Sequence, residues 1–247
     1  MLITSRANPQ IQFVKKLRTA TFRRETGLHF AEGESLVLDA LRSGAGAESV
    51  FVAEGYIPPE FPADINIMEV TPPVMEALCE GKSAPRLCAV LRTPDLRCPA
   101  HYPGGLLVVL ECLQDPGNVG TLIRTADALG ACGVLLSPDC ADPFAGKTLR
   151  AAMGSSYHIP VWQGELPAEL PRLLAQGFSL LCGHLHGHET LPPPTENTAL
   201  VIGNEGHGVS GEIAALCYPY RLPMRGRAQS LNAAVFGAVL MDRVVNR

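Results

Sequence analysis

The sequence lacks any long run of apolar residues. No run approaches the roughly 18 residues that a membrane-spanning helix requires, and the first residues contain no apolar signal region. We therefore expect no membrane association and a cytoplasmic location. The composition suits a packed core, because 47% of the 247 residues are hydrophobic and 18% are charged. This length suffices for one large domain or two modest ones.

The chain also lacks paired cysteines and a recognisable metal motif. Its eight cysteines are scattered, and no two of them have C-x-x-C spacing. His184, His186 and His188 alternate as metal ligands on a strand would, but the interleaved Gly183 and Gly187 favour a flexible loop. We therefore predict a reducing compartment, no disulfide and no metal.

There is no overall excess of positive charge. The formal net charge of −4 argues against bulk electrostatic binding of nucleic acid, but not against a local basic patch. Such a patch lies in residues 1–30, where Glu25 is the only acidic residue. It is either a solvated helix face or a surface that contacts RNA phosphates. Its basic residues are Arg6, Lys15, Lys16, Arg18, Arg23 and Arg24.

Proline and glycine divide the chain into two parts. Residues 96–105 are rich in both and are typical of a linker. Residues 1–95 before it predict a small α/β unit that begins with a basic helix. Within this unit the stretch 54–73 is broken by prolines, and no strand or helix is predicted in it.

From residue 106 strands and helices alternate. This alternation predicts a parallel sheet covered by helices on both faces. The predicted strands are residues 106–110, 134–136, 158–161, 178–182, 199–202 and 220–222. The predicted helices are residues 121–129, 145–153, 168–175, 211–216 and a last helix from about residue 230.

Three polar segments in this second part each follow a short apolar run. They are residues 115–126, 203–208 and 222–233. Apolar runs of about four to eight residues are typical of buried strands. Because loops at the carboxyl ends of parallel strands hold the ligands of α/β folds, we expect the three segments to form one site.

The first segment is a strand–loop–helix corner with two interpretations. In one, Asn118 caps the helix and Arg124 pairs with Asp127 on the surface. In the other, free N–H groups at the helix start and the guanidinium fork of Arg124 bind an RNA phosphate. Taken alone, the segment favours the first interpretation.

The second and third segments contain a glycine pattern and a possible helix start. Gly206, Gly208 and Gly211 are spaced as in a dinucleotide-binding loop. However, three residues separate them from the strand, and the acidic residue expected about 20 positions further on is missing. Ser230 can cap the last helix, whereas Asn232 is a weak helix former whose presence indicates a hydrogen-bonding role.

Together the three segments resemble the motifs of the SpoU (TrmH-type) family of RNA 2′-O-ribose methyltransferases. The order D-P-x-N-x-G-x-x-x-R-T-A, G-N-E-G-x-G and L-P-M-x-G-x-x-x-S-L-N covers about residues 105–247. Residues 5–41 look like the small L30e-like substrate-binding domain that precedes the catalytic domain in many members. The resemblance implies domains at residues 1–95 and 106–247. The second is expected to be a SPOUT-type sheet with a deep C-terminal trefoil knot.

The resemblance also implies chemistry and partners. It implies S-adenosylmethionine (AdoMet) as methyl donor, no metal, an RNA substrate with rRNA favoured over tRNA, and a homodimer through the catalytic domain. It implies that Arg124 binds the phosphate beside the target ribose, and that Asn118, Glu205, Ser230 and Asn232 hold the ribose or order the loops. The residues implied around the cofactor are Gly183, Ile202, Gly203, Glu205, Gly206, Leu222, Met224, Ser230, Leu231 and Ala233.

The predicted function is therefore methyl transfer from AdoMet to a ribose 2′-hydroxyl of a structured RNA. An NAD-linked oxidoreductase using the glycine pattern is one alternative, and the missing acidic residue counts against it. A non-catalytic RNA-binding protein with the same fold is another. The presence of Arg124, Asn118 and Ser230 counts against that one.

Overall fold

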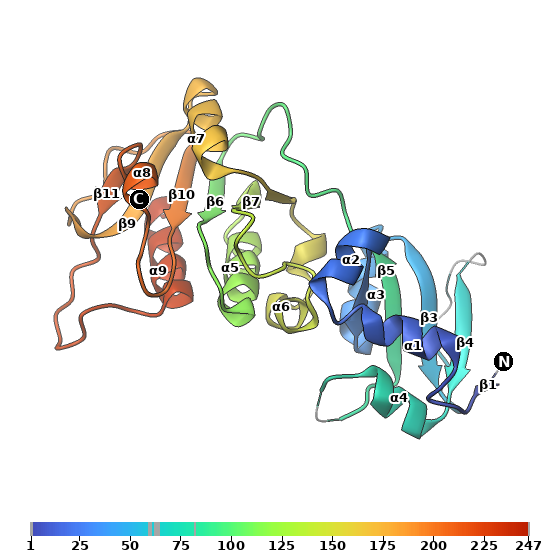
Figure 1. Ribbon diagram of the computed structural model, residues 1–247. Coiled ribbons are helices and arrows are strands. Elements are labelled where there is room, and N and C mark those ends of the chain that lie inside the picture. The colour runs from blue at the N-terminus through green and yellow to red at the C-terminus, as the bar shows by residue number, and fades with distance from the viewer. Residues whose placement is uncertain (1, 59–60, 62–64, 82, 247) are drawn as a thin grey trace.

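The computed structural model describes residues 2–58, 61, 65–81 and 83–246, which form two α/β units, each built around its own sheet (Figure 1). This agrees with the predicted fold class of two α/β units. Within the described residues, no helix is both long enough and apolar enough to cross a membrane.

The N-terminal unit is built around a mixed five-stranded sheet. Its elements are β1 (Leu2–Ile3), α1 (Pro9–Lys16), α2 (Ala20–Thr26), β2 (Leu28–Glu32), α3 (Glu34–Arg42), β3 (Ala47–Ala53), β4 (Asn66–Val70), α4 (Pro72–Leu78) and β5 (Leu87–Arg92). The strand order is β1-β4-β3-β5-β2, with β5 antiparallel to both of its neighbours. Helices α1 and α4 pack around Val14 and Met75 on one face, and α3 packs through Val37 on the other.

Local sequence signals explain part of this unit. The Asn8 side chain accepts a hydrogen bond from the Gln10 N–H at 2.9 Å and caps α1, and Pro9 occupies the first helical turn, where no N–H is needed. Strand β4 was not predicted, because the prolines of residues 54–73 conceal a proline-free run at residues 65–70. That run pairs in parallel with β3, a contact that the local sequence does not reveal.

The C-terminal unit is a six-stranded parallel sheet, as predicted. Its elements are β6 (Leu106–Leu110), α5 (Pro116–Ala128), β7 (Gly133–Leu136), α6 (Gly146–Ala152), the 3₁₀ helix η1 (Ser155–Tyr157), β8 (Val161–Gln163), α7 (Leu166–Ala175), β9 (Ser179–His188), β10 (Thr198–Ile202), α8 (Gly211–Ala214), β11 (Tyr218–Tyr220) and α9 (Ala233–Val245). The strand order is β11-β9-β10-β6-β7-β8.

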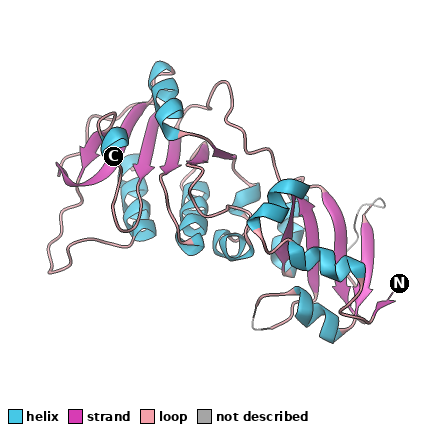
Figure 2. Cartoon of the chain, viewed as in Figure 1, coloured by secondary structure: helices cyan, strands magenta, loops and turns pink. Residues whose placement is uncertain are grey.

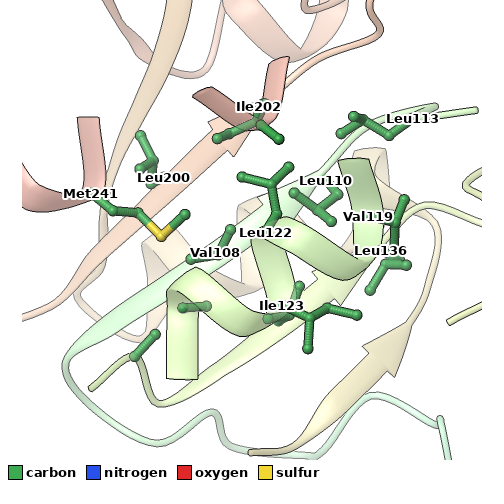
Figure 3. Close-up of a cluster of buried hydrophobic side chains, with 14 of the residues drawn as sticks. Val108, Leu110, Leu113, Val119, Leu122, Ile123, Leu136, Leu200, Ile202 and Met241 are labelled. Carbon is green, nitrogen blue, oxygen red and sulfur yellow. The ribbon is translucent and has the colours of Figure 1, made fainter. Parts of the chain in front are cut away.

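Helices cover both faces of this sheet (Figure 2). Helices α5, α6 and α9 share one apolar core, and α7 and α8 contribute to a second core on the opposite face. In the first core, Leu122 of α5 points toward Ile202 of β10, and Met241 of α9 lies beside Leu200 (Figure 3). Burial on both faces explains why strands β6, β7 and β10 are continuous apolar runs rather than alternating ones.

Two predicted strands are displaced. In place of a strand at residues 158–161, the chain forms η1 and then β8, in which Trp162 is buried edge-on against Tyr102 with ring centroids 5.3 Å apart. In place of a strand at residues 220–222, β11 ends at Tyr220.

The histidine run is strand, not the flexible loop that was predicted. Strand β9 continues through His188 because β11 pairs with it, and the His188 ring packs on Tyr218 with centroids 4.8 Å apart. Gly187 permits this approach, since a Cβ there would lie 2.7 Å from backbone atoms of Pro219. The pairing partner lies about thirty residues further on, so local rules could not predict the extension.

A buried ion pair and a buried histidine join the two units. The guanidinium of Arg23 on α2, which is 7% exposed, donates to Asp142 Oδ2 at 2.6 and 2.9 Å. His29 of β2 is fully buried, and its Nε2 lies 2.7 Å from the Tyr157 hydroxyl. Burial, with a smaller effect of Arg23, lowers the pKa of His29 to about 3, so this imidazole stays neutral at physiological pH.

A second histidine bridges the units at their surface. His158 lies between two carboxylates, with Nδ1 2.8 Å from Asp127 Oδ2 and Nε2 2.9 Å from Asp39 Oδ2. The hydrogen bond to Asp127 and the charge of Asp39 raise the pKa of His158 above its ordinary value of 6.5. This contact is therefore fully present below pH 6.5 and is lost as the pH rises through the raised pKa.

Gly120→Ala tests the close contact between α5 and α6. A Cβ at Gly120 would lie 2.4 Å from the Thr148 carbonyl oxygen and 2.7 Å from the Ala151 Cβ. We expect the free energy of unfolding, measured with urea, to fall by about 1–3 kcal/mol through overpacking. Gly211→Ala is the control, because nothing lies within 4 Å of its added Cβ. Equal stability of the two variants would contradict this packing account.

Candidate active site

A cavity of about 920 Å³ lies beside the carboxyl ends of β9, β10 and β11. Its walls come from β9, from the turn after β10 and from the loop between β11 and α9. Every residue predicted to surround the cofactor lines it, from Gly183 on β9 to Ala233 at the start of α9. The structure thus gathers the second and third predicted segments around one space. Their assignment to the cofactor remains a prediction.

Two glycines let the cavity walls approach one another. A Cβ on Gly203 would lie 2.2 Å from the carbonyl carbon of Gly208, across the turn that follows β10. A Cβ on Gly183 would lie 2.4 Å from the Phe236 ring of α9. These positions therefore require glycine for packing as well as for any contact with a ligand.

The carboxylate of Glu205 links the first predicted segment to the second. Its Oε1 accepts hydrogen bonds from the Asn118 side chain at 2.9 Å and from the Asp115 N–H at 3.2 Å. Its Oε2 accepts from the Gln114 N–H at 3.3 Å. One side chain thus satisfies three donors around the start of α5.

Two asparagines extend this link to the third segment. Asn232 donates from Nδ2 to Asn118 Oδ1 at 3.0 Å. The Oδ1 of Asn232 in turn accepts from the N–H groups of Ala234 and Val235, at 2.9 and 3.2 Å, and so caps α9. The expectation that Ser230 caps the last helix is therefore wrong, and the hydrogen-bonding role expected of Asn232 is confirmed.

Asp115, rather than Asn118, caps α5. Its Oδ1 accepts from the Asn118 N–H at 3.0 Å, and its Oδ2 accepts from the Lys147 ammonium at 2.8 Å. These bonds, that of Lys147 foremost, hold the pKa of Asp115 below its usual range. The expected cap by Asn118 is wrong, because its side chain faces Glu205 and Asn232 instead.

Hydrogen bonds keep Glu205 ionised. Partial burial by itself raises the pKa of Glu205, but bonds from the Asn118 side chain and from backbone N–H groups outweigh it and hold the pKa below its usual value of about 4.5. The contacts of the charged carboxylate are therefore present above pH 4.5 and are lost as the pH falls through the lowered value. Around neutral pH, small changes of pH therefore leave the hydrogen bonds of Glu205 unchanged.

Arg124 lies on the exposed side of α5, two turns from its start. Among the described residues, no side chain forms an ion pair with its guanidinium. The expected surface pair with Asp127 is wrong, because Asp127 binds His158 instead. Arg124 does not line the cavity, so the structure leaves its full set of donors available to a ligand outside it.

The predicted basic surface is smaller than expected. Arg23 is buried, and its guanidinium bonds to Asp142 and to the carbonyls of Leu17 and Arg18, so it cannot reach an RNA phosphate. Arg18 donates to three carbonyls where α4 ends and lies 3.5 Å from Glu80. Arg6 donates to the Pro73 carbonyl and lies 3.9 Å from Glu76. Among the described residues, Lys15, Lys16 and Arg24 form no ion pair.

The prediction missed several residues of the cavity wall. His184 and His186 lie on the extension of β9, and Phe236 comes from α9. Glu189 and Arg221 form an ion pair there. A strand assignment for the histidine run would have found the first two, but Phe236 has no local signal. In the part of the chain that the structure describes, no group of His, Cys, Asp and Glu is arranged to hold a metal.

The glycine pattern does not form a dinucleotide-binding loop. Asn204 and Gly208 form an isolated bridge, and Asn204 Oδ1 accepts from the N–H groups of Gly206 and His207. This closes a tight turn two residues before Ser210, whose hydroxyl caps the four-residue helix α8. A dinucleotide-binding loop instead leads from the strand directly into a long helix. The NAD-linked alternative therefore lacks the geometry that it needs.

Comparison with known proteins shows the family to which this chain belongs. Residues 105–242 match the SpoU rRNA methylase family, and residues 8–89 match the MRM3-like substrate binding domain. The 23S rRNA (guanosine(2553)-2′-O)-methyltransferase RlmP of Bacillus subtilis is 36% identical over 97% of this chain and 97% of its own. The chain therefore belongs to the SpoU rRNA methylase family.

Two solved structures match the fold of this chain over its whole length. An AdoMet-bound rRNA methyltransferase from Sinorhizobium meliloti superimposes with a TM-score of 0.89 and 28% identity, covering 100% of this chain and 97% of that one. An RNA 2′-O ribose methyltransferase gives a TM-score of 0.86 and 26% identity, covering 100% and 98%. The predicted class, an AdoMet-dependent RNA 2′-O-ribose methyltransferase, is confirmed.

Glu205→Gln tests the link between the segments. Glutamine offers one acceptor oxygen, and its NH₂ group would face an N–H donor, so at least one donor loses its partner. We expect the affinity for S-adenosylhomocysteine, measured by calorimetry, to fall roughly tenfold to a hundredfold. Glu196→Gln, an exposed change outside the cavity, should leave the affinity unchanged. Equal affinities in both variants would disprove the linking role.

Proposed function

We propose that this chain methylates a ribose 2′-hydroxyl of 23S rRNA, with its N-terminal unit docking the RNA and its C-terminal unit carrying out the transfer. The observation that carries the proposal is the hydrogen-bonded series Asn232–Asn118–Glu205, which joins the first family motif to the second and third motifs, whose residues line the cavity. The choice of 23S rRNA is supported by the Bacillus relative, which is named for that RNA. Mapping of 2′-O-methyl groups on 23S rRNA with and without the protein tests it.

The cavity suits AdoMet by its lining. Ile202, Leu222 and Phe236 give it an apolar wall, and Gly203 exposes backbone where any side chain would collide. Apolar walls with a few polar groups are what a nucleoside-sized ligand requires. AdoMet would supply a sulfonium-bound methyl group that the ribose oxygen takes in an in-line displacement.

Residues of the first and third segments would align the ribose. Arg124 would bind the phosphate beside the target nucleotide through its planar fork. Because a guanidinium stays protonated, Arg124 does not accept the hydroxyl proton, which passes to a phosphate oxygen or to water. Asn118 and Asn232 would keep the loops in register, and the Ser230 hydroxyl, which lines the cavity, would bind the ribose. Alignment of the two reactants is then the main catalytic contribution.

The C-terminal unit would contain a deep trefoil knot at its C-terminal end. Helix α9 follows a long loop, residues 221–232, and returns to pack against both α5 and β10. Such a return supports threading of this last segment through a loop of the same unit, as the family resemblance implies. An experimental chain trace in which α9 passes outside that loop would rule out the knot.

The active form would be a homodimer formed through the catalytic domain, residues 106–247. Apolar side chains remain open on and near α9, among them Val235, which is 51% exposed, and Val245. A second copy of this chain would bury them. Light scattering of the purified protein tests the proposal, and a monomeric mass at micromolar concentration would contradict it.

Residues 1–95 would form the docking domain and residues 96–105 the linker. This division is supported by the separate sheet of the N-terminal unit. The buried contacts of Arg23 and His29 would hold the docking surface in a fixed position relative to the cavity.

Arg124→Ala tests the assigned role of this arginine. Methyl transfer to RNA should fall at least a hundredfold, because the phosphate loses its bidentate partner. The affinity for S-adenosylhomocysteine should stay within a few-fold, since Arg124 lies outside the cavity. Arg42→Ala, an exposed arginine on α3, serves as the charge-matched control. Transfer that survives Arg124→Ala would show that this role is wrong.

A further inference from the structure

An aromatic pair lies where α1 meets α2 on the outer side of the N-terminal unit. The rings of Phe13 and Phe22 meet edge to face, with centroids 5.3 Å apart at an angle of 70°. On α1, Ile11 and Val14 face the core and are buried, whereas Phe13 remains 36% exposed. Phe22 is partly buried against the same core, which fixes its ring in place.

A single exposed phenylalanine needs no functional explanation. Here, however, a cation lies over one ring of the pair. The Lys16 ammonium, one helical turn after Phe13, lies 5.8 Å from the centroid of the Phe22 ring. Lys16 has no ion-pair partner within the described residues. We refer to Phe13, Lys16 and Phe22 together as the aromatic–lysine patch.

The surroundings of the patch are positively charged. Lys15 and Arg24 lie on the same two helices, and neither pairs with an acidic side chain in the described part of the chain. Glu25 is the only acidic residue on α1 and α2. An acidic occupant with flat aromatic groups matches this combination, because stacking serves the bases of single-stranded RNA and lysine or arginine serves its phosphates.

We propose that the aromatic–lysine patch is a stacking site for an unpaired base of the RNA substrate. The Phe13 ring stacks on the base, Phe22 holds Phe13 in place, and Lys16 binds the adjoining phosphate. The proposal rests on the proposed function, since it names the part of the RNA that the N-terminal unit grips. Sequence-specific RNA recognition commonly uses unpaired bases in this way, because paired bases in A-form helices hide their faces.

The position of the patch would let it help select the target ribose. Helix α2 also carries Arg23, whose ion pair with Asp142 joins the N-terminal unit to the catalytic one. A base held at Phe13 is therefore fixed relative to the catalytic unit, and it selects which ribose can reach the cavity. The patch acts on substrate binding and not on the methyl-transfer step.

Steady-state kinetics with unmodified 23S rRNA test the proposal. Phe13→Ala and Phe13→Leu should both raise KM for RNA roughly fivefold to a hundredfold, the range expected for loss of one stacked base. The kcat and the affinity for S-adenosylhomocysteine should stay within about twofold. Ile57→Ala removes an 89% exposed apolar side chain from the same unit and is the matched control, for which KM should not change.

Leucine separates stacking from plain apolar contact. If Phe13→Leu keeps the wild-type KM while Phe13→Ala raises it, the residue serves packing or a protein contact, and the proposal is overturned. An unchanged KM in both variants overturns it as well. Circular dichroism must show that both variants remain folded, and Phe13→Leu keeps enough apolar bulk for this to be expected.

A direct readout uses a single-stranded oligoribonucleotide that carries 2-aminopurine, whose fluorescence falls when the base stacks. Wild-type protein should quench it and Phe13→Leu should not, whereas equal quenching by both proteins would contradict the proposal. This assay does not require methyl transfer. A chain that quenches the probe but forms no methylated RNA would refute the proposed function and leave the stacking site intact.

Discussion

The arrangement of the three motif loops depends on one carboxylate. Glu205 accepts three hydrogen bonds from the start of α5, and Asn118 passes the link on to Asn232. Fixing a loop costs about 1–2 kcal/mol per residue in backbone entropy. Three polar loops without mutual contacts would therefore not hold one fixed arrangement. Charge-assisted hydrogen bonds of about 1.5–3 kcal/mol each offset part of that cost at the point where the loops meet. The motif residues therefore have a structural role, whatever part the proposed function gives them in catalysis.

The two sheets determine where these loops can be. Because the strands of the C-terminal sheet are buried on both faces, their register is fixed, and the loops that follow β6 and β10 emerge side by side. The N-terminal unit is held against this frame by Arg23 and by the neutral imidazole of His29. In the proposed function, this junction would let RNA bound on α1 and α2 place one ribose at the cavity.

Much of this architecture could be predicted from local signals, and the failures have a common cause. The apolar runs predicted the parallel sheet. The motifs predicted residues that the structure places around one cavity. The rules for helix caps rank Asp115 and Asn118 almost equally, and the contact with Glu205 decides between them. Arg23 was assigned to RNA because its partner Asp142 lies 119 residues away. The strand extension through His188 likewise depends on β11, a distant partner.

The most direct measurement is a double-mutant cycle on the affinity for S-adenosylhomocysteine, with Asn118→Ala, Asn232→Ala and the double variant. If the hydrogen bond between these residues holds two loops of the cofactor site in register, the first substitution should remove most of what the second would remove. The account predicts a coupling of about 1 kcal/mol or more. Strictly additive losses, with a coupling near zero, would show that the loops are ordered independently and would contradict the account.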